Sequence, residues 1–377
     1  MSAKNILIVA GEPSGDLHAS NLVRDLKKIK EGLSFFGLGG TLSKDAGVEI
    51  IFDISKLALI GVVEVVARAF TIRKAYKKLL RAIDLRRPDL AILVDYPGFN
   101  LTLARDLHKR SIPVVYYVSP QVWAWGRDRV KIIRKCVKKM VVFFKFEEEL
   151  YKTYGIDAEW VGHPLLDVVK TTLSKDEVLK KYGLSKEKKL IALLPGSREL
   201  EVRSFLSTMA ESAKIINEKL KDTQFIISKH PDLPLDIYKD AMRHAGIDLK
   251  IADGDTYNIL GAADLAIVAS GTATLETAIL GTPLIIVYRV NLVTFLLYKI
   301  VRVGSYLGLV NIIAGREIAP ELLQYDFTAE KVAIKTVGML SDGKIMETAR
   351  EELGRVRSSL GAAGARERAA RAILPLI

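Results

Sequence analysis

Four short segments of the sequence combine glycine, hydroxyl and charged residues in patterns that could bind an anion or move a proton. They are residues 11–16, 95–100, 195–198 and 270–276. Each directly follows a short apolar run, so each is expected where a strand ends and a helix begins. Glycines at such a position let a ligand approach the backbone, and the N-terminus of the next helix favours a negative charge.

Residues 195–198 (Pro-Gly-Ser-Arg) are interpreted as a binding site for a diphosphate. Gly196 and Ser197 would present backbone N–H groups and a hydroxyl at a helix N-terminus. Arg198 would add a guanidinium group that suits phosphate oxygens. A helix-capping turn is the alternative, but it accounts only for Ser197 and not for the glycine and arginine on either side.

Residues 270–276 (Ser-Gly-Thr-Ala-Thr-Leu-Glu) add a possible contact to a sugar. Ser270, Gly271 and Thr272 are small and would let a ligand approach. Glu276 lies about one helical turn further on, where its carboxylate could accept two adjacent ribose hydroxyls. The alternative is a glutamate in the first helical turn that stabilises the helix dipole. With the diphosphate turn, this segment predicts a nucleotide site in the second half of the chain.

Asp95 is the candidate general base. It follows the apolar run of residues 90–94, and the C-terminal end of a central strand is where doubly wound sheets bind their substrates. A carboxylate placed there could accept a proton from a substrate hydroxyl. The alternative is that Asp95 only forms the turn before Pro97.

Glu12, Ser14 and Gly15 belong to the first segment, residues 11–16, and are candidates for an anion-binding loop. The segment matches neither the dinucleotide pattern G-x-G-x-x-G nor the ATP-binding P-loop. The alternative is a tight turn in which Ser14 or Asp16 caps the following helix.

The elements that must position these residues follow from the hydrophobic pattern. Short runs rich in Val, Ile and Leu, without polar alternation, alternate with helical stretches. This predicts an α/β fold with doubly wound parallel sheets, buried on both faces. The strand–turn–helix opening at residue 11 recurs at residue 195, which indicates two Rossmann-like domains facing each other across a cleft. We expect domains at 1–165 and 166–345, and a helical tail at 346–377 that returns to the first domain or is exchanged with a partner chain.

Charge and composition narrow the class of protein. The chain has 377 residues, of which 49% are hydrophobic, and a net charge of +12. This composition excludes a disordered chain, and a single cysteine excludes a disulfide scaffold. The basic surplus indicates an anionic partner, which could be a phosphorylated substrate, an anionic membrane surface or nucleic acid.

A cytoplasmic protein is expected, because no segment resembles a signal peptide or a membrane span. A peripheral membrane contact is nevertheless predicted near residues 62–85, where an apolar stretch precedes several lysines and arginines. This is the composition of an interfacial helix on anionic lipid, and the alternative is a core helix with a basic outer face. The residues expected to touch lipid or acyl chains are Val62, Val63, Val65, Val66, Ala69 and Phe70.

Two further patterns are given less weight. Asp253-Gly-Asp255 has the spacing of a metal clamp, but a turn in which Asp255 caps the next helix is favoured. Trp123 and Trp125 lie near several basic residues, but a basic helix face or a phosphate contact is favoured over nucleic-acid binding. The histidines are scattered, and no cluster has metal-ligand spacing, so neither a metal nor a cofactor is expected.

These segments together resemble the lipid-A-disaccharide synthase family, which consists of bacterial glycosyltransferases of lipopolysaccharide synthesis. The matching stretches keep the family's order and span nearly the whole chain. The most distinctive is Ser-Pro-Gln-Val-Trp-Ala-Trp at residues 119–125. The full set is residues 10–16, 61–65, 117–125, 161–164, 193–198, 269–276, 283–289 and 311–317.

The resemblance implies a GT-B transferase that joins UDP-2,3-diacylglucosamine to 2,3-diacylglucosamine 1-phosphate. The products would be UDP and the β-1′,6-linked disaccharide phosphate. It also implies an inverting reaction that needs no metal. The family forms homodimers that exchange C-terminal segments, and it is peripheral on the inner face of the inner membrane, so the resemblance implies both properties here. No nucleic-acid partner is expected.

The resemblance also implies roles for single residues. Asp95 matches the family's general base, and Arg198 would stabilise the departing diphosphate. Glu12, Glu276 and Asn311 fall on family motif positions, Glu12 in a loop near donor and acceptor and the other two at the donor site. One position departs from the family, because many members carry a second carboxylate where this chain has Gly98.

Two classes of alternative stay open at this stage. One is another GT-B enzyme that uses UDP-sugars, such as a UDP-N-acetylglucosamine epimerase or a murein-precursor transferase. The other is a non-catalytic protein that binds anionic membranes or nucleic acid.

Overall fold

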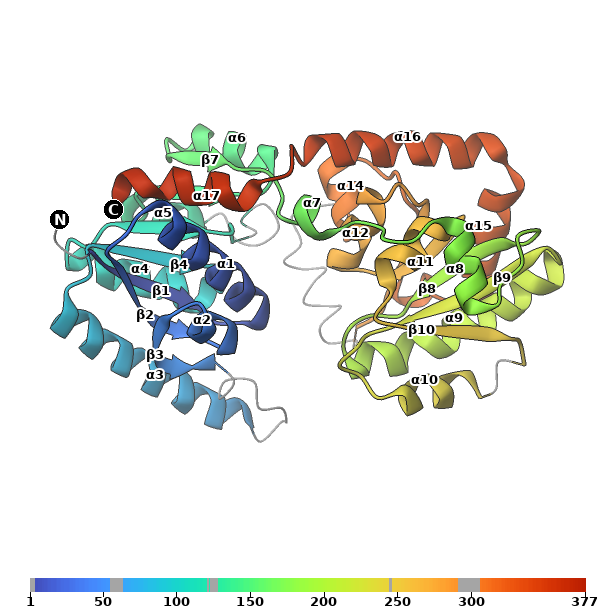
Figure 1. Cartoon of the computed structure of the whole chain (residues 1–377), viewed down its shortest axis with the longest axis horizontal. Helices are drawn as coiled ribbons and strands as arrows, with labels where there is room; N and C mark the ends of the chain where they lie inside the picture. The colour runs from blue at the N-terminus through green and yellow to red at the C-terminus, as the bar shows by residue number, and fades with distance from the viewer. Residues whose placement is uncertain (1–3, 55–63, 121, 123–127, 244–245, 291–305) are drawn as a thin grey trace. The chain divides into compact units, whose positions relative to one another are not determined.

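The computed structural model describes residues 4–54, 64–120, 122, 128–243, 246–290 and 306–377 (Figure 1). The chain forms two compact units, each with its own core. Unit 1 comprises Met1–Pro164 together with Leu360–Ile377, and unit 2 comprises Leu165–Ser359.

Unit 1 is built on a parallel seven-stranded sheet with the order β3-β2-β1-β4-β5-β6-β7. The strands are β1 (Lys4–Ala10), β2 (Leu33–Gly39), β3 (Val48–Asp53), β4 (Leu90–Val94), β5 (Val114–Tyr117), β6 (Lys139–Val142) and β7 (Ala158–Trp160). The helices are α1 (Pro13–Ile29), α2 (Thr41–Asp45), α3 (Glu64–Arg86), α4 (Pro97–Lys109), α5 (Asp128–Cys136), α6 (Lys145–Thr153) and α17 (Ala365–Ile373), followed by η3 (Leu374–Leu376).

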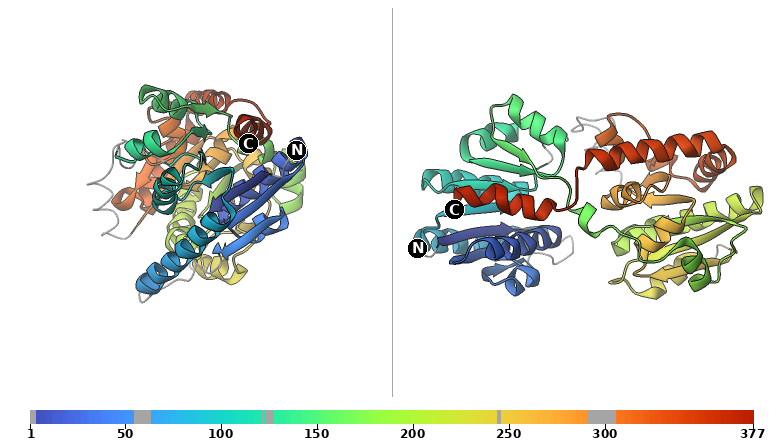
Figure 2. Two further views of the ribbon diagram at one scale, coloured as in Figure 1. Left: turned by 90° about the vertical axis from the view of Figure 1, so that its left-hand side faces the viewer. Right: turned by 45° about the horizontal axis from the view of Figure 1, so that its top comes forward.

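Both faces of the unit 1 sheet are covered, which is why its central strands β4 and β5 are continuous, fully buried apolar runs. Alternate residues of β1 point to opposite faces. Ile6 and Ile8 join a cluster with α1 and α17, whereas Leu7 and Val9 join a cluster with α3, α4 and α5. The C-terminal helix α17 lies alongside α1 in unit 1 (Figures 1 and 2).

Unit 2 has a parallel six-stranded sheet with the order β10-β9-β8-β11-β12-β13. The strands are β8 (Lys189–Leu194), β9 (Thr223–Lys229), β10 (Leu249–Asp253), β11 (Leu265–Ala269), β12 (Leu284–Tyr288) and β13 (Glu321–Leu323). The helices are α7 (Leu165–Val168), α8 (Lys175–Tyr182), α9 (Glu199–Lys219), α10 (Leu235–Met242), α11 (Thr256–Ala262), α12 (Thr272–Ile279), α14 (Leu309–Ala314), η2 (Gln324–Asp326), α15 (Ala329–Ser341) and α16 (Gly343–Ser359).

Local sequence signals account for several helix ends. Ser174 and Glu177 form a capping box at the start of α8, and Gly183 ends that helix in the left-handed conformation that glycine adopts at least cost. Helix α1 instead begins with Pro13 at its first position, which needs no backbone N–H there.

Asp16 has a different role from the helix cap suggested by the sequence. Its buried carboxylate lies in α1 but accepts backbone N–H groups from Gly40 at 2.8 Å and from Ser43 at 3.2 Å. Asp16 therefore caps the N-terminus of α2, not that of its own helix. The N-cap of α1 is Glu12, which makes no side-chain capping bond.

The predicted doubly wound α/β fold is confirmed, because both sheets are parallel and helices alternate with strands. In each unit the first strand is central, and the strand order reverses beside it. The reversal falls between β1 and β4 in unit 1 and between β8 and β11 in unit 2. Within the described residues, no helix is both long enough and apolar enough to cross a bilayer.

Candidate functional site

The candidate residues of unit 1 lie at the point where the strand order reverses. Glu12 follows β1, and Asp95 directly follows β4. These two strands are paired, with Ala10 opposite Val94. The carboxyl ends of parallel neighbours meet at one edge of the sheet, so the fold brings Glu12 and Asp95 together there.

Asp95 stands in a strained turn that several hydrogen bonds hold in place. Asp95 and Tyr96 both have left-handed backbones, with φ of 47° and 46°. The Asp95 N–H donates to the Tyr117 carbonyl at 3.1 Å, and the Asp95 carbonyl accepts the Asn100 side-chain amide at 2.8 Å. The Tyr116 hydroxyl also donates to the Asp95 carbonyl, at 2.5 Å. Such backbone strain persists only where surrounding contacts enforce it, and it is often found at functional sites.

Burial changes the chemistry of the Asp95 carboxyl group. Burial and the nearby negative charge of Glu12 raise the pKa of Asp95 from 3.8 to about 6, and the backbone N–H of Tyr96 opposes this shift. The folded protein therefore holds this proton more tightly than the unfolded chain, so ionising Asp95 between pH 3.8 and about 6 lowers stability. A carboxylate with a pKa near 6 is a stronger base than an ordinary aspartate, which suits general base catalysis.

The glycines near Asp95 differ from one another in their surroundings. A side chain on Gly11 would lie 2.0 Å from the ring of Tyr96, so that ring takes the space through which a ligand was expected to approach. Gly15 is buried beside β1 and β4, whereas Ser14 is exposed. Gly98 is exposed and has no atom within 4 Å of the place where a side chain would begin. The second acid that the family resemblance places at this position would therefore fit there.

Two histidines that are far apart in the sequence also meet in unit 1. The rings of His18 and His163 each contact Phe143, with centroids 5.2 and 5.4 Å away. Burial lowers the pKa of His18 to about 4 and that of His163 to about 3, and Arg366 adds to the shift of His18. Both imidazoles are therefore neutral near pH 7 and form part of an aromatic cluster.

The candidate turns of unit 2 also lie where the strand order reverses. Residues 195–198 follow β8, residues 270–276 follow β11, and these strands pair with Leu194 opposite Val268. The fold therefore brings the predicted diphosphate turn and the predicted ribose contact to neighbouring strand ends.

Arg198 is the N-cap residue of α9, and its side chain is 79% exposed. Its guanidinium donates to the carboxylate of Glu201 at 3.2 Å, and the backbone N–H of Ser197 donates to the same carboxylate at 3.2 Å. Glu201 was not expected from the sequence. Glu201 lies three residues after the N-cap, which is the spacing of a capping box, and this spacing could have indicated its contact with the start of α9.

Glu276 lies in the second turn of α12, because that helix begins at Thr272 and has no acidic residue in its first turn. The structure therefore does not support the alternative of a first-turn glutamate. The Glu276 carboxylate is largely buried, which raises its pKa, and it accepts the hydroxyl of Tyr257 at 3.1 Å. Gly271 has open space around it, and the Ser270 N–H donates to the Val287 carbonyl at 2.9 Å.

Asn311 is fully buried, and its side chain is used inside unit 2. Its oxygen accepts the backbone N–H groups of Ile318 and Ala319, at 2.8 and 3.0 Å. Its amide donates to the Ala319 carbonyl at 2.7 Å and to Glu321 at 2.9 Å. Glu321 in turn accepts the N–H of Gly308 at the start of α14. Asn311 thus holds the segment around α14 in shape.

The predicted lipid contacts can be followed only in part. Val62 and Val63 lie outside the described residues. Val65, Val66 and Ala69 belong to α3, but their side chains are not described. The Phe70 side chain is 68% exposed. Trp123 and Trp125 also lie outside the described residues.

The Asp253–Asp255 pair is held by other side chains of unit 2. Lys229 binds Asp253 at 2.9 Å, and Lys181 binds Asp255 at 2.7 Å. Asp255 occupies the N-cap position of α11 but makes no side-chain capping bond, so the proposed cap is wrong in that respect. In the part of the chain that the structure describes, no group of three or more His, Cys, Asp or Glu residues could hold a metal ion.

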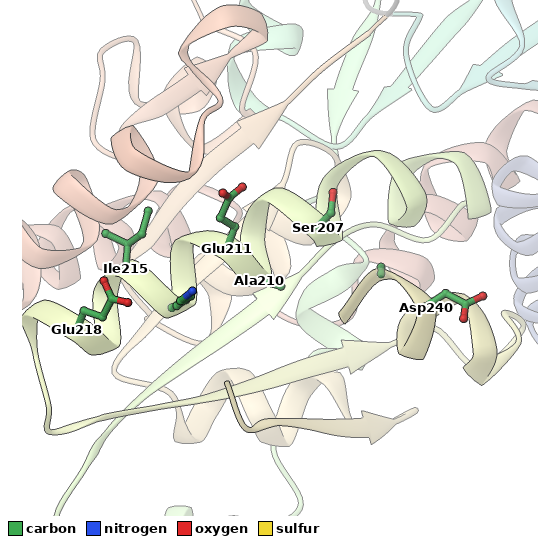
Figure 3. Close-up of a pocket in the computed structure, with 8 residues that line it drawn as sticks. Ser207, Ala210, Glu211, Ile215, Glu218 and Asp240 are labelled. Carbon is green, nitrogen blue, oxygen red and sulfur yellow. The ribbon is translucent and has the colours of Figure 1, made fainter. Parts of the chain in front are cut away.

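A groove of about 510 Å³ lies between α9 and α10, and Figure 3 shows its side chains. None of the predicted site residues lines it. Its lining residues are Ser207, Ala210, Glu211, Lys214, Ile215, Glu218, Asp240 and Ala241.

Comparison with known proteins identifies the family and the fold of the chain. A family model described as lipid-A-disaccharide synthetase matches residues 6–373. The lipid-A-disaccharide synthase of Syntrophus aciditrophicus is 43% identical over 378 residues, which cover 100% of this chain and 99% of that protein.

Two solved glycosyltransferase structures share the fold. MurG from Acinetobacter baumannii superposes with a TM-score of 0.62 at 17% identity and covers 99% of each chain. The calicheamicin glycosyltransferase CalG4 superposes with a TM-score of 0.61 at 14% identity, covering 100% of this chain and 98% of its own. At these identities the likeness concerns the fold alone, and it confirms the predicted GT-B fold.

The contact between Tyr257 and Glu276 can be tested by binding. Glu276 is predicted from the sequence to accept ribose hydroxyls, and the Tyr257 hydroxyl holds its carboxylate in place. Tyr257→Phe removes that hydroxyl and keeps the ring, so we expect UDP to bind about two- to tenfold more weakly by calorimetry. The loss should be smaller for 2′-deoxy-UDP, which offers fewer hydroxyls to Glu276. Tyr182→Phe is the matched control, because Tyr182 donates to Asp255 at 2.8 Å. Equal losses in the two variants would contradict a specific role for Tyr257.

Proposed function

The chain belongs to the lipid-A-disaccharide synthetase family and is therefore a glycosyltransferase of lipid A biosynthesis, and we propose the reaction that it catalyses and the residues that carry it out. The donor is UDP-2,3-diacylglucosamine, and the acceptor is 2,3-diacylglucosamine 1-phosphate. The products are UDP and the β-1′,6-linked disaccharide phosphate. The reaction inverts the configuration at the donor carbon and needs no metal ion.

The observation that carries this proposal is the half-buried Asp95 carboxylate, fixed in a left-handed turn at the end of β4 with a raised pKa. Asp95 removes the proton from the acceptor hydroxyl while that oxygen attacks C1 of the donor sugar. Gly98 leaves Asp95 without a second acid in its turn. The proton acceptor in the step is therefore Asp95 alone, and Glu12 raises its basicity through like-charge repulsion.

Unit 2 binds the donor nucleotide in this proposal. The backbone N–H groups of Gly196 and Ser197 and the guanidinium of Arg198 receive the diphosphate, whose negative charge grows as the bond to the sugar breaks. Glu276 accepts the ribose hydroxyls. The remaining donor contacts come from the small residues Ser270, Gly271 and Thr272, while Asn311 holds the neighbouring segment.

The acylated substrates require a site near lipid, and α3 is the proposed contact. The exposed ring of Phe70 precedes a series of exposed basic residues, Arg73, Lys74, Lys77, Lys78 and Arg81. An apolar start followed by exposed cations suits an anionic membrane surface. We extend this contact to Val62, Val63, Val65, Val66 and Ala69, and place the enzyme on the inner face of the inner membrane. The proposed homodimer comes from the family resemblance.

A direct assay tests the reaction. The protein is incubated with both acylated substrates, with and without a chelator, and UDP release is measured. We expect UDP and a disaccharide phosphate in equal amounts, at a rate that the chelator does not change. Release that needs a divalent cation would contradict the metal-independent mechanism. A failure to release UDP would contradict the proposed function itself.

The role of Asp95 predicts a defined pH dependence. Only the ionised carboxylate can accept a proton, so kcat/KM should fall about tenfold per pH unit below about 6 and level off above it. Glu12→Gln removes the like charge beside Asp95, so the midpoint should move to lower pH. Glu31→Gln, a change at an exposed residue beyond the other end of α1, should leave the midpoint in place. An unchanged midpoint in Glu12→Gln would refute the proposed coupling.

Arg198 is expected to act on the departing diphosphate. Loss of one preorganised donor to a developing negative charge typically costs about 2.7–4 kcal/mol, so Arg198→Ala should lower kcat by roughly 10²–10³. The control is Arg203→Ala on the same helix, where Arg203 pairs with Glu199 at 2.8 Å. Near wild-type turnover in Arg198→Ala would remove Arg198 from the mechanism.

A further inference from the structure

We propose that Glu201 is an internal anion that occupies the diphosphate subsite of residues 195–198 until the donor displaces it. This inference rests on the proposed function, because it names the side chain that competes with the donor phosphates. Glu201 would then set donor affinity without touching the reacting atoms.

The contacts of Glu201 are those expected of a bound anion. One carboxylate oxygen accepts the backbone N–H of Ser197 at 3.2 Å, and the other accepts the Arg198 guanidinium at 3.2 Å. These are two of the donors that the sequence predicts for a phosphate. The Glu201 side chain is only 19% exposed, whereas that of Arg198 is 79% exposed. The acid therefore lies against the turn, and the cation extends over it into solvent.

Gly196 makes this arrangement possible. A side chain on Gly196 would lie 2.5 Å from a carboxylate oxygen of Glu201 and 2.8 Å from its Cβ. The φ of Gly196 is 118°, a conformation that side chains rarely adopt. The space that a glycine leaves for a ligand at this turn is thus occupied by the carboxylate of Glu201.

The charges around Tyr288 also indicate that Glu201 and Arg198 lie together at the diphosphate turn. Tyr288 ends β12, and burial raises the pKa of its hydroxyl; Glu201 raises it further, while Arg198 lowers it. Both charges therefore act on one small region at the strand ends. A diphosphate that bound there beside an unmoved Glu201 would meet a like charge at the same donors.

The alternative is that Glu201 stays in place and only positions Arg198, as its capping-box spacing allows. The two roles predict opposite changes in affinity. If Glu201 must be displaced, removing its charge strengthens diphosphate binding. If Glu201 holds Arg198 ready for the ligand, removing its charge weakens binding.

The test measures the binding of UDP and of uridine to the full chain by calorimetry at low ionic strength. Glu201→Gln keeps the size of the side chain and an oxygen for the Ser197 N–H but removes the charge. We expect UDP to bind roughly two- to fivefold more tightly to this variant, as for loss of a partly exposed ion pair. Uridine, which has no phosphate, should bind as it does to the wild type. Added salt should reduce the difference for UDP.

Glu199→Gln is the matched control, because it removes the same charge from the same first turn of α9, where Glu199 pairs with Arg203. Tighter UDP binding confined to Glu201→Gln, with unchanged thermal unfolding, supports displacement. Equal tightening in both variants shows a general charge effect and overturns the inference, as does weaker binding in Glu201→Gln. A wild-type chain that does not bind UDP overturns the proposed function instead.

Discussion

The reversal of strand order beside the first strand of each sheet is the constraint on which the rest of the structure depends. In unit 1, α1 leaves β1 toward one face of the sheet and α4 leaves β4 toward the other, where each joins a separate apolar cluster. The two connections therefore diverge at the strand ends, and doubly wound proteins bind their ligands at such points. The same reversal in unit 2 brings the two candidate nucleotide turns to neighbouring strands.

The two reversal points offer different chemical groups. In unit 1 two acids stand at adjacent strand ends, and their repulsion together with burial keeps the Asp95 proton more firmly bound than usual. In unit 2 the strand ends present backbone N–H groups and Arg198, which already hold a carboxylate. The first arrangement suits a base that accepts a proton, and the second suits an anion. The proposed glycosyl transfer uses one of each.

Two residues on family motifs, Asn311 and Asp16, use their buried side chains to hold the fold in shape. Asn311 binds the backbone of residues 318 and 319, and its partner Glu321 accepts N–H groups at the start of α14. Asp16 joins α1 to α2 in the same manner. Their buried side chains satisfy backbone groups that would otherwise lie unpaired, and an unpaired buried polar group is costly. A position in a motif therefore does not by itself identify a contact with substrate.

The sequence by itself determined the doubly wound fold and the location of the candidate segments at strand ends. Buried parallel strands consist of continuous apolar runs in the sequence, and the turn residues follow these runs directly. Only the tertiary structure decided which groups meet: Tyr257 with Glu276, Asp16 with the start of α2, and Glu12 with Asp95. It also decided that Glu201 lies against the diphosphate turn, although capping-box spacing pointed to a local contact. Hydrogen bonds and pKa shifts depend on separations of a few ångströms and on burial, which the packing of distant segments sets and residue spacing does not record.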